Sequence, residues 1–100
     1  MKPFRTYELA KSFYQECSNL QFHGAMKNQF ERALLSVVLN VSEGSGRATK
    51  KDRSHFYFIS YASLKETRTM LDLGNYHQHL GQADILGAHL WKLAKNPGGS

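Results

Sequence analysis

The stretch that decides the fold joins a long apolar run to a glycine-rich break and reads Ala33-Leu34-Leu35-Ser36-Val37-Val38-Leu39-Asn40-Val41-Ser42-Glu43-Gly44-Ser45-Gly46-Arg47. Its apolar side chains extend a stripe that recurs at steps of three and four residues, which is the period of an α-helix. The stripe consists of Met26, Phe30, Ala33, Leu34, Val37 and Val41. Leu35, Val38 and Leu39 occupy the other side, and a helix that is apolar nearly all round is buried on more than one face. We therefore predict a helix over residues 25–43 with neighbours on several sides.

Two segments on either side of this stretch show the same period. The segment before it should end near Gln21–Gly24, and its apolar set is Tyr7, Ala10, Phe13, Tyr14, Cys17 and Leu20. The segment after it begins beyond Gly46, where Thr49 followed by Asp52 resembles a capping box. Its stripes extend to about Gly74, so a third helix is expected there.

A fourth helix is expected over residues 82–95, where Leu86, Leu90 and Leu93 share a face. Nothing in the sequence is typical of a strand or a two-residue hairpin. Because short connections make successive helices antiparallel, we predict an all-α, antiparallel up-and-down four-helix bundle. Residues 1–95 should form this single domain, and residues 96–100, which are rich in helix breakers, a flexible tail.

Composition limits the classes of partner and compartment. The 100 residues fit one domain with a small core, which a partner subunit would help to stabilise. Thirteen Lys and Arg against eight Asp and Glu give a net charge of +5, which favours anionic partners. Cys17 is the only cysteine, which indicates a reducing compartment. No signal peptide or membrane span is evident, so we predict a cytoplasmic protein with no membrane partner.

The segment from Asn40 to Arg47, followed by Lys50, Lys51, Phe56 and Ala62-Ser63-Leu64-Lys65-Glu66-Thr67, resembles the four helix bundle protein family. This family is also called the 23S rRNA intervening-sequence protein family. Tyr7-Glu8-Leu9-Ala10 and the set Gln29, Arg32, Ala33, Ser36 and Val37 fit it too, so the resemblance covers residues 7–90.

The resemblance implies a long antiparallel bundle that assembles into a ring-like homopentamer. Members are encoded within intervening sequences of bacterial 23S rRNA genes. Relatives are accessory proteins of diversity-generating retroelements and resemble binders of nucleic acid and of a reverse transcriptase. The family name therefore implies the fold more directly than the function.

Arg47, Lys50, Lys51 and Arg53 make the segment after the glycines strongly basic, with Asp52 as its only acid. Positive charge at a helix N-terminus opposes the helix dipole, which favours a functional reason for it. Gly44 and Gly46 are expected to make the adjoining backbone flexible. Basic side chains beside a flexible backbone can contact phosphates. The alternative is an exposed loop followed by a solvated first helical turn.

Asn40 and Glu43 lie near the C-terminal end of the second predicted helix, where a carboxylate also opposes the dipole. We favour a structural role over catalysis for both. They would bond to the turn at 44–48, pair with Arg47 or Arg32, or tie the second helix to the third. Glu66 is expected to pair with a base such as Arg32 across the bundle, since an unpaired buried carboxylate is costly.

Several kinds of chemistry are disfavoured by what the sequence lacks. Carboxylate-bridged di-iron bundles use two Glu-x-x-His motifs, and this chain has none. His77 and His79 lie in a predicted turn without the further ligands that zinc needs. Cys17 lies on an apolar stripe, which is typical of a buried, unreactive thiol. We therefore predict no metal, no cofactor and no enzymatic activity.

Two functions remain, and they belong to different classes. The preferred one is a non-enzymatic, basic, homo-oligomeric scaffold that binds nucleic acid, RNA or a ribonucleoprotein, through electrostatic contacts. The alternative is a protein–protein adaptor without direct nucleic-acid binding, for example for a reverse transcriptase or another acidic partner. A ribosomal component is a further candidate partner. Tyr57, Tyr61 and Trp91 could stack on bases, although aromatic side chains at helical spacing are usually core or interface.

Overall fold

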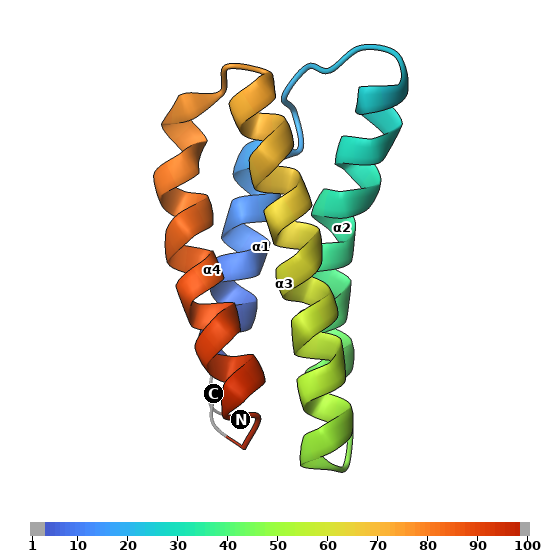
Figure 1. Ribbon diagram of the computed structural model, residues 1–100, viewed down its shortest axis with the longest axis vertical. Coiled ribbons are helices and arrows are strands. Elements are labelled where there is room, and N and C mark those ends of the chain that lie inside the picture. Colours follow the sequence, from blue (N-terminus) through green and yellow to red (C-terminus); the bar gives the residue numbers. More distant parts are fainter. Residues whose placement is uncertain (1–3, 99–100) are drawn as a thin grey trace.

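The computed structural model describes residues 4–98 and has the predicted all-α fold, a bundle of four helices (Figure 1). The elements are α1 (Arg5–Cys17), α2 (Ala25–Ser45), α3 (Lys50–Leu73), a short 3-10 helix η1 (His77–His79) and α4 (Leu80–Lys95). Residues 4–98 contain no strand. Figure 1 shows that each helix runs opposite to the one before it, so the bundle is antiparallel and up-and-down.

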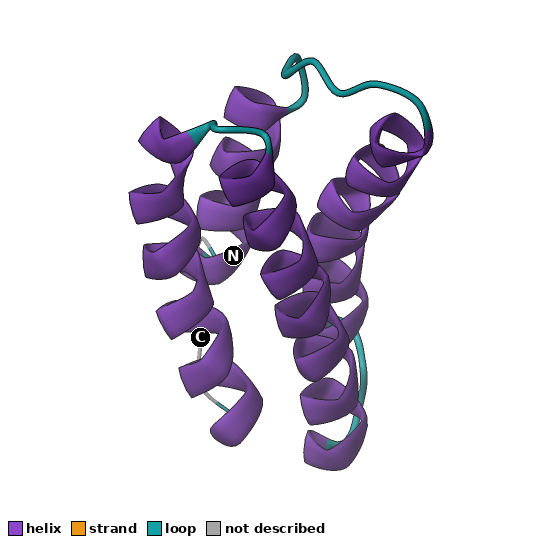
Figure 2. Ribbon diagram, turned by 45° about the horizontal axis from the view of Figure 1, so that its top comes forward, coloured by secondary structure: helices purple, strands orange, loops and turns teal. Residues whose placement is uncertain are grey.

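The shape follows from the length of α3. Its 24 residues, at about 1.5 Å per residue, span roughly 36 Å, close to the 39 Å long dimension of the molecule. Figure 2 shows α1, α2, α3 and α4 side by side along this axis. Within residues 4–98 no helix is long and apolar enough to cross a lipid bilayer.

Most of the predicted stripe of α2 is buried, as expected: Phe30, Ala33, Leu34, Val37 and Val41 all belong to the core, and Met26 is partly buried against it. Cys17 is fully buried on α1, and burial raises the pKa of its thiol to about 11. The prediction of a buried thiol is confirmed, and the raised pKa disfavours the thiolate, which is the reactive form. Leu35 and Leu39 differ from expectation, because both side chains are exposed in this single chain.

The connection between α1 and α2 contains a core residue that periodicity did not find. α1 ends at Cys17, short of the predicted end near Gln21–Gly24. Phe22 lies in the loop that follows, and its side chain is buried. The centre of its ring lies 4.3 Å from that of Phe30 and 5.4 Å from that of Tyr76. A single aromatic residue in a loop has no periodic neighbours, so only the folded chain shows its position. α2 then begins after Gly24, whose φ of 59° suits glycine.

The C-terminal end of α2 corrects a prediction. The helix continues through Gly44 to Ser45, whereas we expected glycine to loosen the chain after Glu43. Gly44 is buried, and a Cβ atom added there would lie 2.7 Å from Cε1 of Tyr57 on α3. This glycine therefore permits a close helix contact rather than a flexible turn. The predicted cap of α3 is confirmed, because the backbone N–H of Asp52 donates to Oγ1 of Thr49 over 3.1 Å.

Candidate nucleic-acid interface

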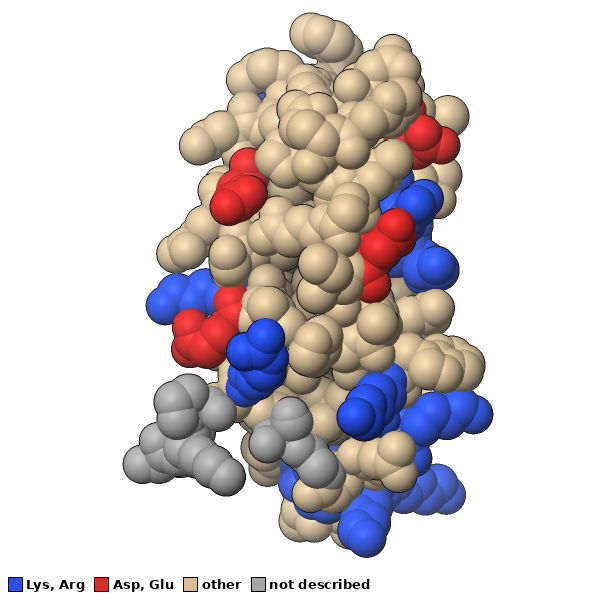
Figure 3. Space-filling view, turned by 90° about the vertical axis from the view of Figure 1, so that its left-hand side faces the viewer, with Lys and Arg blue, Asp and Glu red and all other residues tan. Residues whose placement is uncertain are grey.

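Lysine and arginine side chains gather at one end of the bundle, which we call the basic end (Figure 3). It comprises the start of α1, the α2–α3 turn with the start of α3, and the end of α4 with the residues that follow it. Its cations are Arg5, Arg47, Lys50, Lys51, Arg53, Lys92 and Lys95, and its acids are Glu8, Glu43 and Asp52. The other described charges are five Lys or Arg and five Asp or Glu, so the positive excess of residues 4–98 lies entirely here.

Lys50 and Lys51 form the first turn of α3, and both side chains are exposed. Neither makes an ion pair with a carboxylate in the described part of the chain. Lys50 also shares a pocket of about 430 Å³ with Lys95, which comes from the end of α4. The fold therefore places two lysines that are 45 residues apart in the sequence around one hollow.

Arg47 is held in place on the surface. Its Nη2 lies 3.0 Å from Oε2 of Glu43, and its guanidinium carbon lies 4.6 Å from the centre of the Phe56 ring. The predicted link between Glu43 and Arg47 is thus confirmed as an ion pair. Both side chains are about half exposed, so the pair contributes only about 0–1 kcal/mol to stability. One face of the guanidinium packs on the Phe56 ring and its Nη2 pairs with Glu43, whereas about half of the side chain stays exposed.

Arg53 has a structural role that the sequence did not indicate. Its Nε donates to the carbonyl of Pro97 over 2.9 Å, and its Nη1 donates to the carbonyls of Arg47 and Ala48 over 3.1 and 3.0 Å. The guanidinium thereby ties the α2–α3 turn to the segment after α4. We expected Arg53 to reach phosphates from the solvent, but three of its contacts are already made to backbone.

Two contacts hold part of the predicted flexible tail, residues 96–100, against the rest of the molecule. Pro97 is fixed by its bond to Arg53, and Gly98 lies against the side chain of Lys50. The tail therefore takes part in the basic end up to Gly98. Residues 99–100 lie outside the described residues.

The structure shows which of the predicted structural roles applies to Asn40. Its Nδ2 donates to the carbonyl and to Oγ of Ser36, both over 2.9 Å, and Oγ of Ser36 lies 2.7 Å from Oγ of Ser63 on α3. Ser36 thus ties α2 to α3, and Asn40 bonds to Ser36 from within α2. None of these bonds goes to the turn at 44–48. The bond of Asn40 to Ser36 is possible because Ser36 lies one helical turn before Asn40, facing α3.

The predicted pair between Glu66 and Arg32 is wrong. Both side chains are exposed, and no ion pair joins them in residues 4–98. Arg32 instead donates to Oε1 of Gln29 one turn earlier on α2. Glu66 lies on the outer side of α3, where water solvates the carboxylate and no partner is required. Gly46, the last motif residue, caps α2 through its backbone N–H on the carbonyl of Glu43.

The residues that sequence reasoning missed come from the chain termini. Arg5, Lys92 and Lys95 are far from Arg47 in sequence, and the antiparallel topology alone brings them to the basic end. The signal was available in principle, since an up-and-down bundle places its first and last residues beside the second turn. Among residues 4–98 no group of three His, Cys, Asp or Glu is arranged to hold a metal ion.

Comparison with known protein families gives one match. A family model described as 23S rRNA-intervening sequence protein matches residues 4–90, so the chain belongs to this family. Neither the curated proteins nor the solved structures contain a match to the chain.

Proposed function

From the membership of this family and the charge at the basic end, we propose that the protein is a non-enzymatic, homo-oligomeric scaffold that binds RNA through phosphate contacts. The observation that carries the proposal is the segregation of charge. The basic end carries seven cationic and three acidic side chains, whereas the charges in the rest of residues 4–98 balance. The family description refers to 23S rRNA, which supports RNA as the class of nucleic acid.

Lys50, Lys51 and Arg47 are the phosphate ligands. The two lysines are exposed on the first turn of α3, whose free N–H groups and dipole also favour an anion. Arg47 can present the N–H donors that Glu43 does not engage to a phosphate. Each contact releases condensed counterions from the nucleic acid, so binding is strongest at low salt and has little sequence preference.

Assembly multiplies these contacts. Leu35 and Leu39 lie one turn apart on α2, with 43% and 55% of their surface exposed. Large apolar side chains exposed side by side favour contact with another subunit. Together with the resemblance described above, this supports a ring-like homopentamer in which the basic ends act together on one RNA.

Salt-dependent binding tests the proposal. Binding of a labelled single-stranded RNA and of a DNA duplex is measured by fluorescence anisotropy over a series of salt concentrations. The variant Lys50→Gln/Lys51→Gln should bind both more weakly and reduce the magnitude of the log–log salt slope on the single strand by about 1.4 per engaged subunit. A matched control, Lys11→Gln/Lys27→Gln, removes the same charge outside the basic end and should bind nearly as the parent does.

The outcomes separate the candidate functions. If the parent fails to bind either nucleic acid at low salt, or if both double variants weaken binding equally, the basic end is not a phosphate site. The adaptor function would then take its place, with an acidic protein as the partner. Light scattering of Leu39→Lys against the parent tests the assembly, and a parent of monomer mass would overturn it.

A further inference from the structure

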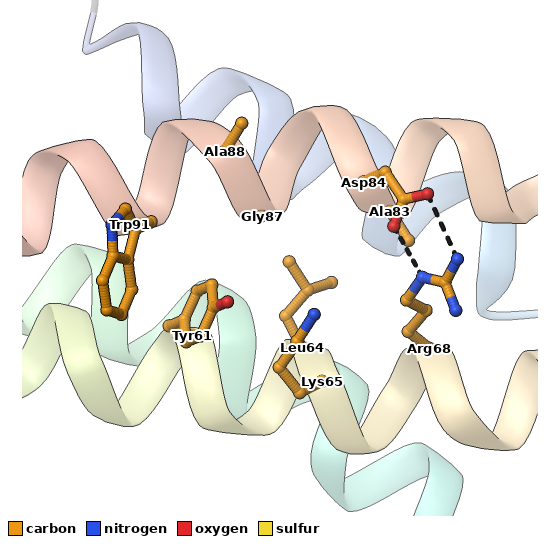
Figure 4. A pocket seen from close by; sticks show the side chains of 9 residues that line it. All are labelled: Tyr61, Leu64, Lys65, Arg68, Ala83, Asp84, Gly87, Ala88 and Trp91. Carbon is orange, nitrogen blue, oxygen red and sulfur yellow. Dashed lines mark hydrogen bonds and ion pairs between the residues drawn. The ribbon is translucent and has the colours of Figure 1, made fainter.

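A groove lies between α3 and α4, along the side of the bundle (Figure 4). It has a volume of about 330 Å³. Leu64 contributes its apolar side chain, and Gly87 and Ala88 leave the α4 side with little bulk. Figure 4 shows Tyr61 and Trp91 at one end of the groove and the ion pair of Arg68 with Asp84 at the other. The groove is thus an apolar slot with one aromatic end and one polar end.

The aromatic end exposes an unusual amount of ring surface. Trp91 is the single tryptophan of the chain and is 46% exposed, although its ring centre lies 5.3 Å from that of Tyr61. Phe58, 36% exposed, meets the same ring edge to face at 5.8 Å. These three rings form a cluster at the surface, whereas large aromatic side chains are usually buried in the core.

Cations accompany these rings. Nζ of Lys95 lies 5.0 Å from the centre of the Trp91 ring, and Nζ of Lys65 lies 5.6 Å from that of Tyr61. The one carboxylate lining the groove belongs to Asp84, and Arg68 binds both of its oxygens over 2.5 and 3.2 Å. The free charge beside the slot is therefore positive.

The groove is continuous with the basic end. Lys95 follows Trp91 by one turn of α4 and also lines the pocket at Lys50. A chain with its bases at Trp91 would place its next phosphates near Lys95 and Lys50. Exposed rings interleaved with cations, leading into a basic surface, are the arrangement that binds single-stranded nucleic acid.

We propose that the α3–α4 groove is a stacking site for an unpaired base of single-stranded RNA, with Trp91 as the platform and Lys95 on the adjoining phosphate. This inference deepens the proposed function and rests on it. RNA suits the groove because the free charge beside the slot is positive, whereas a second copy of this chain carries no excess of negative charge to meet it. A duplex, whose bases are already stacked, would use the basic end alone.

The intrinsic fluorescence of Trp91 reports on the site directly. The probe is an oligoadenylate of about twelve nucleotides, within the range of site sizes found for single-strand binders. It is compared with an abasic strand that carries the same number of phosphates and no bases. The oligoadenylate should quench the fluorescence and bind more tightly than the abasic strand, which should bind without quenching.

Two variants assign the effect to the ring. Stacking contributes about 1–3 kcal/mol per base, so Trp91→Leu should weaken oligoadenylate binding about 5- to 150-fold. The same change should leave binding of the abasic strand and of a duplex unchanged. Ile85→Ala is the matched control, since Ile85 is an exposed apolar residue on the same helix, and it should bind as the parent does.

Each contrary result overturns the inference in a recognisable way. Equal affinity for the two strands, without quenching, removes the stacking site and leaves the proposed function intact. Absence of binding to every strand at low salt removes both proposals. If Trp91→Leu lowers the mass of the assembly and leaves RNA affinity unchanged, the groove is an interface with a second copy. A thermal melt of each variant verifies that it is folded.

Discussion

Helix α3 meets its two neighbours in different ways. Against α2 it forms the most extensive contact of the bundle, closed by small residues on both sides: Gly44 admits the ring of Tyr57, and Ser60 donates to the carbonyl of Val37 over 2.7 Å. Against α4, Gly87 faces Leu64, and a Cβ atom added to Gly87 would still lie at an ordinary contact distance, 3.5 Å, from Leu64. The groove between the two helices therefore remains open.

The comparison teaches that a small residue closes a helix contact only where the facing helix supplies a side chain that fills the space. Tyr57 does so at Gly44 and is nearly fully buried. Tyr61, one turn later on α3, is only partly buried and lies beside Trp91 at the mouth of the groove. One contact therefore contributes stability, whereas the other leaves a surface available for binding.

The largest expected effect breaks the closed contact. Gly44→Ala places a Cβ atom 2.7 Å from Cε1 of Tyr57, closer than real Cβ atoms approach, and the buried ring must move. Overpacking of this kind costs about 1–3 kcal/mol in the free energy of unfolding. Urea denaturation measures it. In the control Gly46→Ala, the new methyl group meets only two backbone carbonyl oxygens, at 3.7 and 3.9 Å. A loss equal to that of Gly44→Ala would contradict the steric explanation.

A smaller effect tests the polar link across the same contact. Ser60 is fully buried, and Ser60→Ala removes its bond to Val37, which should cost about 1 kcal/mol. The exposed Ser45 makes a comparable 2.8 Å bond to the carbonyl of Ser42, where water can replace the hydroxyl. Ser45→Ala should therefore melt close to the parent, and equal losses in the two variants would show that burial is not the cause.

The open contact should respond in the opposite direction. Gly87→Ala adds a methyl group at 3.5 Å from Leu64, an ordinary contact distance, and replaces a glycine inside a helix. The variant should be more stable by about 0.5–1 kcal/mol. It should also narrow the groove and weaken oligoadenylate binding. Gly81→Ala, where the methyl group meets no atom within 4 Å, should leave that binding unchanged.

The smallest effect concerns the ion pair at the polar end of the groove. The hydrogen bond from Arg68 holds the pKa of the Asp84 carboxyl below its ordinary value of 3.8. A lowered pKa in the folded state stabilises the fold above about pH 3.8 and loses that contribution as the pH falls through the lower, folded value. Thermal melts of the parent and Asp84→Asn should differ slightly at neutral pH and converge in acid. A constant difference across this range would mean that the carboxylate charge is not responsible.

The sequence by itself determined what depends on neighbours a few residues apart. The helical stripes, the Thr49 cap and the pairing of Glu43 with Arg47 follow from steps of three and four residues, which an α-helix brings together wherever it lies. The burial of Cys17 follows in the same way from its place on an apolar stripe. The bundle was predicted from four helical segments joined by short connections, and the family resemblance implied the same fold.

Only the tertiary structure decided which side chains meet across helices. The contact of Tyr57 with Gly44, the bonds of Arg53 to Pro97 and the exposure of Trp91 depend on how far each helix is rotated and shifted along its axis. A stripe of apolar residues fixes the rotation of a helix only to within the width of the stripe. Within that range, a small rotation decides whether an aromatic ring is buried or lines the groove. The position of Lys95 beside Lys50 depends likewise on the axial register of α4 against α3, which no local spacing in the sequence records.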